Sequence, residues 1–361
     1  ILGSTVPSAS APETSAQAGQ PAATIPQAAL ESARNELQAA QQAAQRLSLN
    51  TTQVISASYT ARQELFSSLV LLTGNRLSQN PKNELLDILQ PEKEPVRPAT
   101  PFDLSQLDQS SNQETAGYAA AAKANLANYD QLLKEYTQLK NETDELKKKS
   151  PSAELSAAIV SSRAKLRVLK LLLFDEKIQL YANLRKLLDL DTLSTAAINS
   201  FQIDSGDEWA QAYQSLENFR PYALLRSLAR LERAEQRLTQ YTTTTTGEAR
   251  VNAFQELQSA QQTLNQSAAL LETWLQSELQ TALQSSAGTT AAYQASHQET
   301  IARLATAQYY LQSYQAAQAD LETVLDSQER ILSAQERLRT TEVQAAEAHA
   351  HASAVGEAAR L

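Results

Sequence analysis

The sequence predicts an all-α fold: an elongated antiparallel helical bundle or coiled coil of roughly five to seven long helices, joined by short connecting helices. Helix-breaking residues are rare in the second half of the chain, where residues 152–355 contain one proline, Pro221, and three glycines. Apolar side chains recur there mostly at steps of three and four residues, which places them on one helix face. Because glycine and proline are the usual helix terminators, we expect Thr289 to Val355 to form a single helix.

Residues 1–26 are expected to form a disordered tether. Four prolines stand there among Ser, Ala, Thr and Gln, and Glu13 is the only charged side chain. This composition buries too little apolar area to offset the entropy lost on ordering. Uncharged tethers of this kind are common next to anchors outside the cytoplasm, so we expect an extracytoplasmic protein, whether periplasmic, on the cell surface or secreted. The alternative is an ordinary disordered terminus.

An N-terminal helical segment is expected over residues 27–90. A helix from about Pro26 to Thr73 carries an apolar stripe, and Gly74 supplies its stop. The weak helix formers at residues 50–52 permit a bend or a break within this helix. A short helix is expected to follow over about Lys82 to Leu89.

A proline-rich crossover is expected over residues 91–112. The prolines at 91, 95, 98 and 101 exclude regular structure, and the charged residues between them suit a solvated and fairly stiff connection. A short helix and a loop within Phe102 to Asn112 then let the chain reverse direction.

A central helical bundle is expected over residues 113–246. The helix from Pro151 to Leu188 has the most apolar sequence and is the best candidate for the core helix, with Ser150 as its N-cap and Pro151 as its first residue. The other expected elements, in order, are a helix over about Gln113–Lys149, a turn at Ser205, Gly206 and Asp207, a helix over Trp209–Phe219, a helix begun or kinked at Pro221, and a link at Thr242–Thr246.

A C-terminal helical hairpin with a fraying tail is expected over residues 247–361. Its first helix runs from Glu248 to about Gln284, and its second is the long helix that ends the chain. Leucines recur along that last helix at heptad-like but imperfect steps with glutamines between them, which favours a defined register. From Ala345 the sequence becomes small and polar, so the tip is expected to fray.

The last helix also carries the candidate residues for protein contacts. Tyr309 and Tyr310 are adjacent and cannot both face one groove, so at least one should be exposed or should contact a neighbouring subunit. The alternative is that both lie at the edge of a seam within the chain. The interaction candidates are Tyr309, Tyr310, Tyr314, Leu321, Leu325, Leu332 and Leu338.

No catalytic, cofactor or metal site is expected, and the chain is predicted not to be an enzyme. It has no cysteine, and its glycines are isolated, so it lacks thiolate chemistry and a phosphate-binding loop. His349 and His351 lie two positions apart and point to different sides of a helix, while His297 stands alone. The carboxylate pairs Asp189/Asp191 and Asp204/Asp207 are expected to cap helix ends and turns.

The net charge of −9 leaves no basic footprint for nucleic acid, and no apolar run is long enough for a membrane span. We therefore expect a non-catalytic helical scaffold, spacer or assembly subunit that acts by protein–protein association, including association with itself, because thin Ala/Gln-rich stripes gain from partner helices. Two alternatives stay open. One is a membrane-active secreted protein, such as a pore-forming or translocator component, built on the apolar segment Leu166 to Leu190. The other is the extracytoplasmic helical domain of a larger membrane protein.

Overall fold

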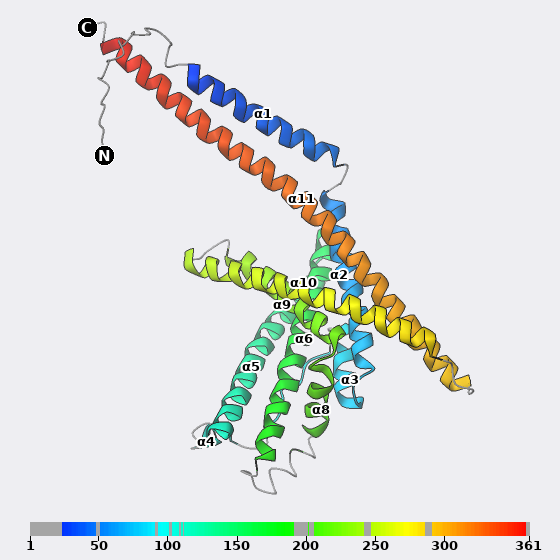
Figure 1. The fold of residues 1–361 in the computed structure, drawn as a ribbon. Coiled ribbons are helices and arrows are strands. Elements are labelled where there is room, and N and C mark those ends of the chain that lie inside the picture. The colour runs from blue at the N-terminus through cyan, green and yellow to red at the C-terminus, as the bar shows by residue number, and fades with distance from the viewer. Residues whose placement is uncertain are drawn as a thin grey trace, which may run out of the picture. The chain divides into compact units, whose positions relative to one another are not determined.

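The computed structural model describes residues 24–47, 51–90, 93–100, 103–107, 110, 112–190, 201, 206–241, 247–285 and 291–358. Within these ranges every regular element is a helix, which confirms the all-α fold class (Figure 1). The elongated coiled-coil arrangement stays a prediction. Residues 1–23 of the expected tether and the expected link at Thr242–Thr246 lie outside the described residues.

The chain divides into two compact units. Unit 1 comprises Ile1–Ile55 and Gln318–Leu361, and unit 2 comprises Ser56–Ala317. The unit boundaries fall inside two helices, whereas the chain segments expected from the sequence were bounded mainly by loops and prolines. That segment division stays a prediction.

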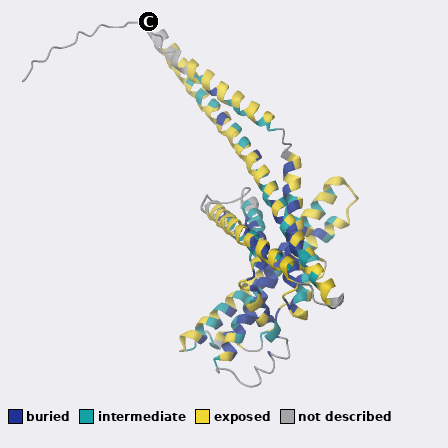
Figure 2. Ribbon diagram, turned by 45° about the vertical axis from the view of Figure 1, so that its right-hand side comes forward, coloured by how far each residue is buried: buried dark blue, intermediate teal, exposed yellow. Residues whose placement is uncertain are grey.

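Unit 1 is built from helix α1 and the end of helix α11, which run side by side in opposite directions (Figure 1). Figure 2 shows that buried positions occur only at intervals along this pair. Ala33 of α1 and Val324 and Ala334 of α11 are buried, and Arg337 donates to Glu36 at 3.3 Å. The bounds are α1 Thr24–Arg46 and α11 Ala291–Ala358, of which residues 318–358 belong to unit 1.

Unit 2 holds the larger hydrophobic core. Helices α5 and α6 pack along each other, α6 also packs on α8 and α9, and α9 packs on α10 (Figure 1). Residues 291–317 of α11 add Leu304, Leu311 and Tyr314 to this core. The remaining bounds are α2 Thr51–Gly74, α3 Gln79–Leu86, the 3-10 helix η1 Asp87–Leu89, α4 Leu104–Leu107, α5 Gln113–Lys147, α6 Ala153–Asp189, α8 Gly206–Leu216, α9 Arg220–Tyr241 and α10 Gly247–Gln284.

Helix α6 is the core helix of unit 2, as its apolar sequence predicts. From Leu166 to Leu188 it is buried on nearly every side, the pattern of a helix surrounded by other helices. Three charged side chains in this stretch are also buried, and each has partners. The Lys170 ammonium donates to the carbonyls of Asp87 and Gln90 at 2.7 and 3.0 Å. These contacts attach the end of η1 to the core helix.

The other two buried charges of α6 contact different helices. The Lys177 ammonium donates to Glu84 at 2.6 Å and lies 3.9 Å from the centre of the Trp209 ring. The Asp175 carboxylate accepts a hydrogen bond from the Tyr222 hydroxyl at 2.8 Å. A buried charge is tolerated only when it is paired and hydrogen-bonded, so these contacts specify how α3, α8 and α9 pack on α6.

The proline-rich crossover is held along α5. The Tyr129 hydroxyl donates to the carbonyl of Val96 at 2.7 Å, and the Arg97 guanidinium binds Asp130 through two hydrogen bonds of 2.6 and 2.8 Å. Residues 93–100 contain no helix, and Leu104–Leu107 form the short helix expected after the prolines. The crossover is therefore anchored by side chains of α5.

Several helix ends differ from the expectations. The helix expected over about Pro26 to Thr73 is described as two helices, and α1 begins at Thr24, inside the expected tether. Of the weak helix formers where a bend or break was expected, Thr51 and Thr52 lie inside α2, and residue 50 lies outside the described residues. The N-cap of α6 is Ser152, which accepts from the Leu155 amide at 3.1 Å. The expected cap at Ser150 was wrong, because the backbone stays non-helical through Ser152 and the Ser152 hydroxyl supplies the cap.

The turn expected at Ser205, Gly206 and Asp207 was wrong for Gly206 and Asp207, which open helix α8, and Ser205 lies outside the described residues. A Cβ atom on Gly206 would lie 2.7 Å from the Phe201 ring. Glycine is required here for the close approach of an aromatic side chain, a reason that the local sequence does not reveal. Pro221 stands in the first turn of α9, one of the two places expected for it.

Candidate functional site

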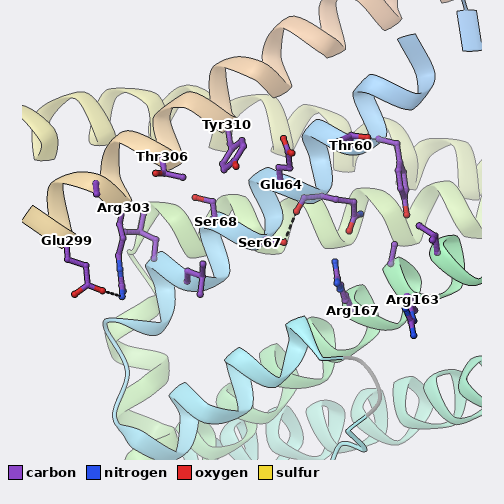
Figure 3. A pocket seen from close by; sticks show the side chains of 17 residues that line it. Thr60, Glu64, Ser67, Ser68, Arg163, Arg167, Glu299, Arg303, Thr306 and Tyr310 are labelled. Atoms are coloured by element: carbon purple, nitrogen blue, oxygen red, sulfur yellow. Dashed lines mark hydrogen bonds and ion pairs between the residues drawn. The ribbon is translucent and has the colours of Figure 1, made fainter. Parts of the chain in front are cut away.

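Unit 2 carries a groove of about 760 Å³ between three helices (Figure 3). It is lined by residues 59–72 of α2, 160–167 of α6 and 299–310 of α11. The lining positions on each helix recur at steps of three and four, so the groove follows α2 and α11 for about three helical turns.

The polar and apolar lining residues of the groove are unevenly distributed. On α2 the lining passes from Tyr59 and Thr60 through two serines to Leu71 and Leu72. The side chains of Leu71 and of Val160 on α6 are exposed, although both are large and apolar. Exposed apolar side chains that line a concave surface are typical of a binding site.

Three arginines and two glutamates line the groove. Figure 3 shows Arg163 and Arg167 on the same helix, toward the Thr60 end, whereas Glu299 and Arg303 lie at the other end. Arg303 and Glu299 form an ion pair one turn apart on α11. Arg167 is half-buried, its Nε atom has no hydrogen-bond partner, and it forms no ion pair within the part of the chain that the structure describes.

Tyr59 separates the groove from a second, more polar cavity. Its hydroxyl is buried and has no hydrogen-bond partner among the described residues. Burial raises the pKa of the Tyr59 hydroxyl, and the Glu232 carboxylate raises it further, while Arg167 and Arg62 oppose the shift. Tyr59 therefore lines both cavities and interacts electrostatically with Arg167 of the groove and with Arg62 and Glu232 of the second cavity.

The second cavity, which we call the cleft, has a volume of about 720 Å³. It is lined by residues 59–62 of α2, 135–142 of α5, 161–169 of α6 and 232–237 of α9. Ion pairs cross it: Arg62 donates to both carboxylate oxygens of Glu235 at 2.8 and 3.3 Å, and Arg233 donates to both of Glu135 at 3.0 and 3.3 Å. The first pair is bidentate through two nitrogens, whereas Arg233 shares Nη2 between the two oxygens of Glu135; together the pairs join α2 and α5 to α9.

Glu232 is the unusual acid of the cleft. Burial raises the pKa of the Glu232 carboxyl to about 7, with the like charge of Glu235 adding to the shift and the cations Arg62 and Lys165 opposing it. Nearby cations do not compensate for the lost hydration, because Arg62 is already committed to Glu235. Glu232 therefore changes charge close to neutral pH.

The tyrosine candidates on the last helix have different surroundings. Tyr309 is 65% exposed, Tyr310 lines the groove, and Tyr314 is buried in the core of unit 2. The rings of Tyr309 and Tyr310 meet edge to face, with their centres 5.4 Å apart. The expectation that at least one of these two neighbours is exposed is confirmed. Their role in protein contacts stays a prediction.

The leucine candidates lie in unit 1. Leu325 and Leu332 are 52% and 64% exposed, and Val343 on the same helix is 52% exposed. Leu321 and Leu338 are half-buried. The structure thus separates the leucine candidates into an exposed pair and a half-buried pair.

The polar residues considered for chemistry are dispersed. His349 and His351 are exposed on α11, and the His297 ring stacks on Tyr293 with centres 6.2 Å apart. Arg185 pairs with both Asp189 and Asp207, at 3.0 and 2.8 Å. Asp191 and Asp204 lie outside the described residues. Among the residues that the structure describes, no group of three His, Asp or Glu side chains is placed to hold a metal ion.

The sequence reasoning missed the groove and the cleft. Both assemble segments that are far apart along the chain, and nothing in one helix marks Arg167 or Glu232 as unusual. The only signal was a charged residue within an otherwise apolar helical stripe, which most helices carry somewhere.

The chain matches no protein-family model, no curated protein and no solved structure. Within the described ranges, no helix combines the length and apolar character needed to cross a membrane. Leu166 to Leu188 pack in the core of unit 2, and the membrane-active alternative stays untested.

Proposed function

We propose that the chain is a non-catalytic helical assembly subunit that associates with copies of itself through helix α11. One observation carries the proposal: Leu325, Leu332 and Val343 form an exposed apolar stripe on unit 1. They lie seven and eleven residues apart, so at about 100° per residue they fall on one line along the helix. The pair of α1 and α11 leaves this stripe in water, where it is unfavourable.

A second copy of the same stripe is the occupant that fits best. Leu325 and Leu332 are separated by one heptad of seven residues, and Gln328 and Gln335 lie close to the edge of the stripe. Leucines at heptad spacing pack into the spaces of an identical helix, and polar residues near the seam select one register. Arg339 lies seven residues after Leu332 on the same line, and Glu336 lies beside it, so opposite charges within the stripe can pair between copies.

The experiment is size-exclusion chromatography with multi-angle light scattering on the wild-type chain and a double variant. We expect the wild-type mass to exceed that of one chain at micromolar concentration. Leu325→Glu with Leu332→Glu places two buried charges in the proposed seam, so its mass should fall to that of one chain. Both side chains are exposed in the single chain, so the variant should keep its helical content by circular dichroism.

A charge-matched control separates the stripe from a general effect of added charge. Ser333 and Gln344 are exposed on another side of α11, so Ser333→Glu with Gln344→Glu adds the same charge outside the proposed seam. This control should keep the wild-type mass. A wild-type chain that stays monomeric up to about 100 μM, or a control that dissociates as fully as the double variant, would contradict the proposal.

The proposed setting is outside the cytoplasm, in the cell envelope or secreted. It is supported by the uncharged Pro/Ser/Thr/Ala/Gln composition of residues 1–26, and by nothing in the helices. A tagged full reading frame expressed in its own host tests it. Digestion of the tag by protease added to intact cells, or its recovery from the medium, is the expected result, and full protection would contradict the assignment.

A further inference from the structure

The groove between α2, α6 and α11 has features of a ligand site that self-association does not use. All of its lining residues belong to unit 2, whereas the stripe of the assembly proposal lies in unit 1. We propose that the groove binds a single-chain amphiphile with a carboxylate head, such as a medium-chain fatty acid, with the head toward Arg167 and the chain toward Leu71 and Leu72.

Arg167 is the residue that we expect to bind the carboxylate head of the ligand. Arg167 is half-buried and makes no hydrogen bond or ion pair with any residue the structure describes. A partly desolvated guanidinium without an acid is unfavourable, and a carboxylate is its natural bidentate partner. Tyr59, whose hydroxyl also has no partner among the described residues, lines the same groove within electrostatic range of Arg167. A carboxylate would supply the acceptor that this end of the groove lacks.

The other charges of the groove do not provide that acceptor. Glu299 is already paired with Arg303 at the far end, and Glu64 is exposed on α2. An exposed carboxylate is screened by water and salt. The end of the groove at Arg167 therefore carries a net positive charge toward the carboxylate head of the ligand.

The apolar end of the groove, at Leu71 and Leu72, is where we expect the alkyl chain of the ligand to bind. Leu71 and Leu72 are about 18 Å from Tyr59 along α2, at about 1.5 Å per residue, and Ala302 of α11 also lines the groove. The hydroxyls of Thr60, at the head end, and of Ser67, farther along α2, donate to carbonyls of their own helix at 2.9 Å. These hydroxyls need no partner from a ligand, so they present little obstacle to an alkyl chain.

Isothermal titration calorimetry with chain-matched amphiphiles tests the proposal. Dodecanoate, below its micelle concentration, should bind with a stoichiometry of about one per chain. Octanoate should bind more weakly, because each CH₂ group buried in an apolar site raises the affinity about fourfold. Dodecyltrimethylammonium has the same chain and the opposite charge, and should bind at least about tenfold more weakly than dodecanoate.

Variants locate the two ends of the ligand. Arg167→Gln should weaken dodecanoate binding about tenfold or more, because it removes the charged donor at the head. Leu71→Gln should weaken dodecanoate binding more than octanoate binding, and it changes a side chain that is already exposed. The matched control is Arg220→Gln, which removes an exposed arginine of unit 2 that does not line the groove and should leave the affinity within about twofold.

Several outcomes would overturn the proposal. Equal binding of the anionic and cationic amphiphiles, loss of the chain-length effect, or binding unchanged by Arg167→Gln would each do so. Uptake of many amphiphiles per chain would indicate detergent-like binding instead. No dodecanoate binding by the folded wild-type chain would leave the groove to a peptide segment or a second copy, and this too would overturn it.

Discussion

Two tyrosine hydroxyls of unit 2 differ in whether they have a hydrogen-bond acceptor, and this difference should change how each contributes to the stability of the protein. The Tyr129 hydroxyl donates to the carbonyl of Val96 at 2.7 Å, whereas the buried Tyr59 hydroxyl has no partner among the described residues. A buried hydrogen bond stabilises a protein by about 1 kcal/mol, and a buried polar group without a partner destabilises it by a similar or larger amount. The same substitution should therefore have opposite effects at the two positions.

Tyr59→Phe should raise the free energy of unfolding by up to about 1 kcal/mol, because it removes an unsatisfied hydroxyl and keeps the ring. Tyr129→Phe should lower it by about 1 to 2 kcal/mol and leave the Val96 carbonyl without its donor. Urea unfolding followed by circular dichroism measures both. An equal loss in the two variants would mean that the Tyr59 hydroxyl is hydrogen-bonded in solution.

Glu232 of the cleft should make the stability of the folded protein depend on pH. The pKa of its carboxyl rises from an ordinary value of 4.5 to about 7 on folding, mainly because of burial. The folded state then binds more protons than the unfolded state between these two values, so the free energy of unfolding falls as the pH rises through this window. The full loss is at most about 3 kcal/mol, and the partial exposure of the side chain reduces it.

Glu232→Gln should therefore stabilise the protein at pH 8, leave it nearly unchanged at pH 4.5, and flatten the decline between these values. Part of the decline should remain, because burial also raises the pKa of Glu176. Denaturant unfolding at several pH values is the measurement. Glu142→Gln is the matched control, since it removes an acid from the same cleft at an exposed position. A slope that Glu232→Gln does not change would show that Glu232 stays ionised through this range.

At the scale of the elements, the sequence predicts the helices well and their exact ends less well. The 3.6-residue periodicity and the scarcity of glycine and proline are properties of the whole segment, which is why α6 and α11 were both predictable as long helices. The ends depend on single backbone contacts. Ser150 and Ser152 are both suitable caps by residue type, and the choice between them depends on the residue at which the backbone becomes helical, which is Ala153 in the structure.

Ser152→Ala should lower the free energy of unfolding by about 1 kcal/mol, because the Leu155 amide loses its acceptor at the start of the core helix. Ser150→Ala provides the control, and its effect should stay within about 0.5 kcal/mol. Thermal and urea unfolding measure both. If Ser150→Ala proves the more destabilising variant, the helix begins two residues earlier than in the structure.

The groove between α2, α6 and α11 could not be predicted from the sequence, because it depends on how separate helices pack together. The groove needs the register of three helices that lie about 90 and 140 residues apart along the chain, and amphipathic periodicity specifies a buried face without specifying its neighbour. The exposed stripe on α11 was accessible from the sequence, because it depends on the spacing of Leu325 and Leu332 within one helix. The half-buried Leu338 was not distinguishable from them.

At the scale of the whole molecule, the two units differ in how much apolar surface each buries. Unit 2 surrounds α6 with side chains from several helices, whereas few positions of α1 and of residues 318–358 are buried. Local stability follows buried contacts, so amide hydrogen exchange should be slow in α6 and much faster in α1 and residues 318–358 when the protein is dilute.

Self-association should slow amide hydrogen exchange in the part of α11 that carries the stripe. If a second copy covers the stripe at Leu325, Leu332 and Val343, protection of residues 321–343 should rise with protein concentration, because binding to the folded helix opposes its local opening. Exchange in α6 should not depend on concentration. Hydrogen exchange with mass spectrometry at two concentrations, in the wild type and in Leu325→Glu with Leu332→Glu, measures this, and the variant should lose the dependence. Protection that is equal at both concentrations in an oligomeric wild type would place the contact between copies on another surface.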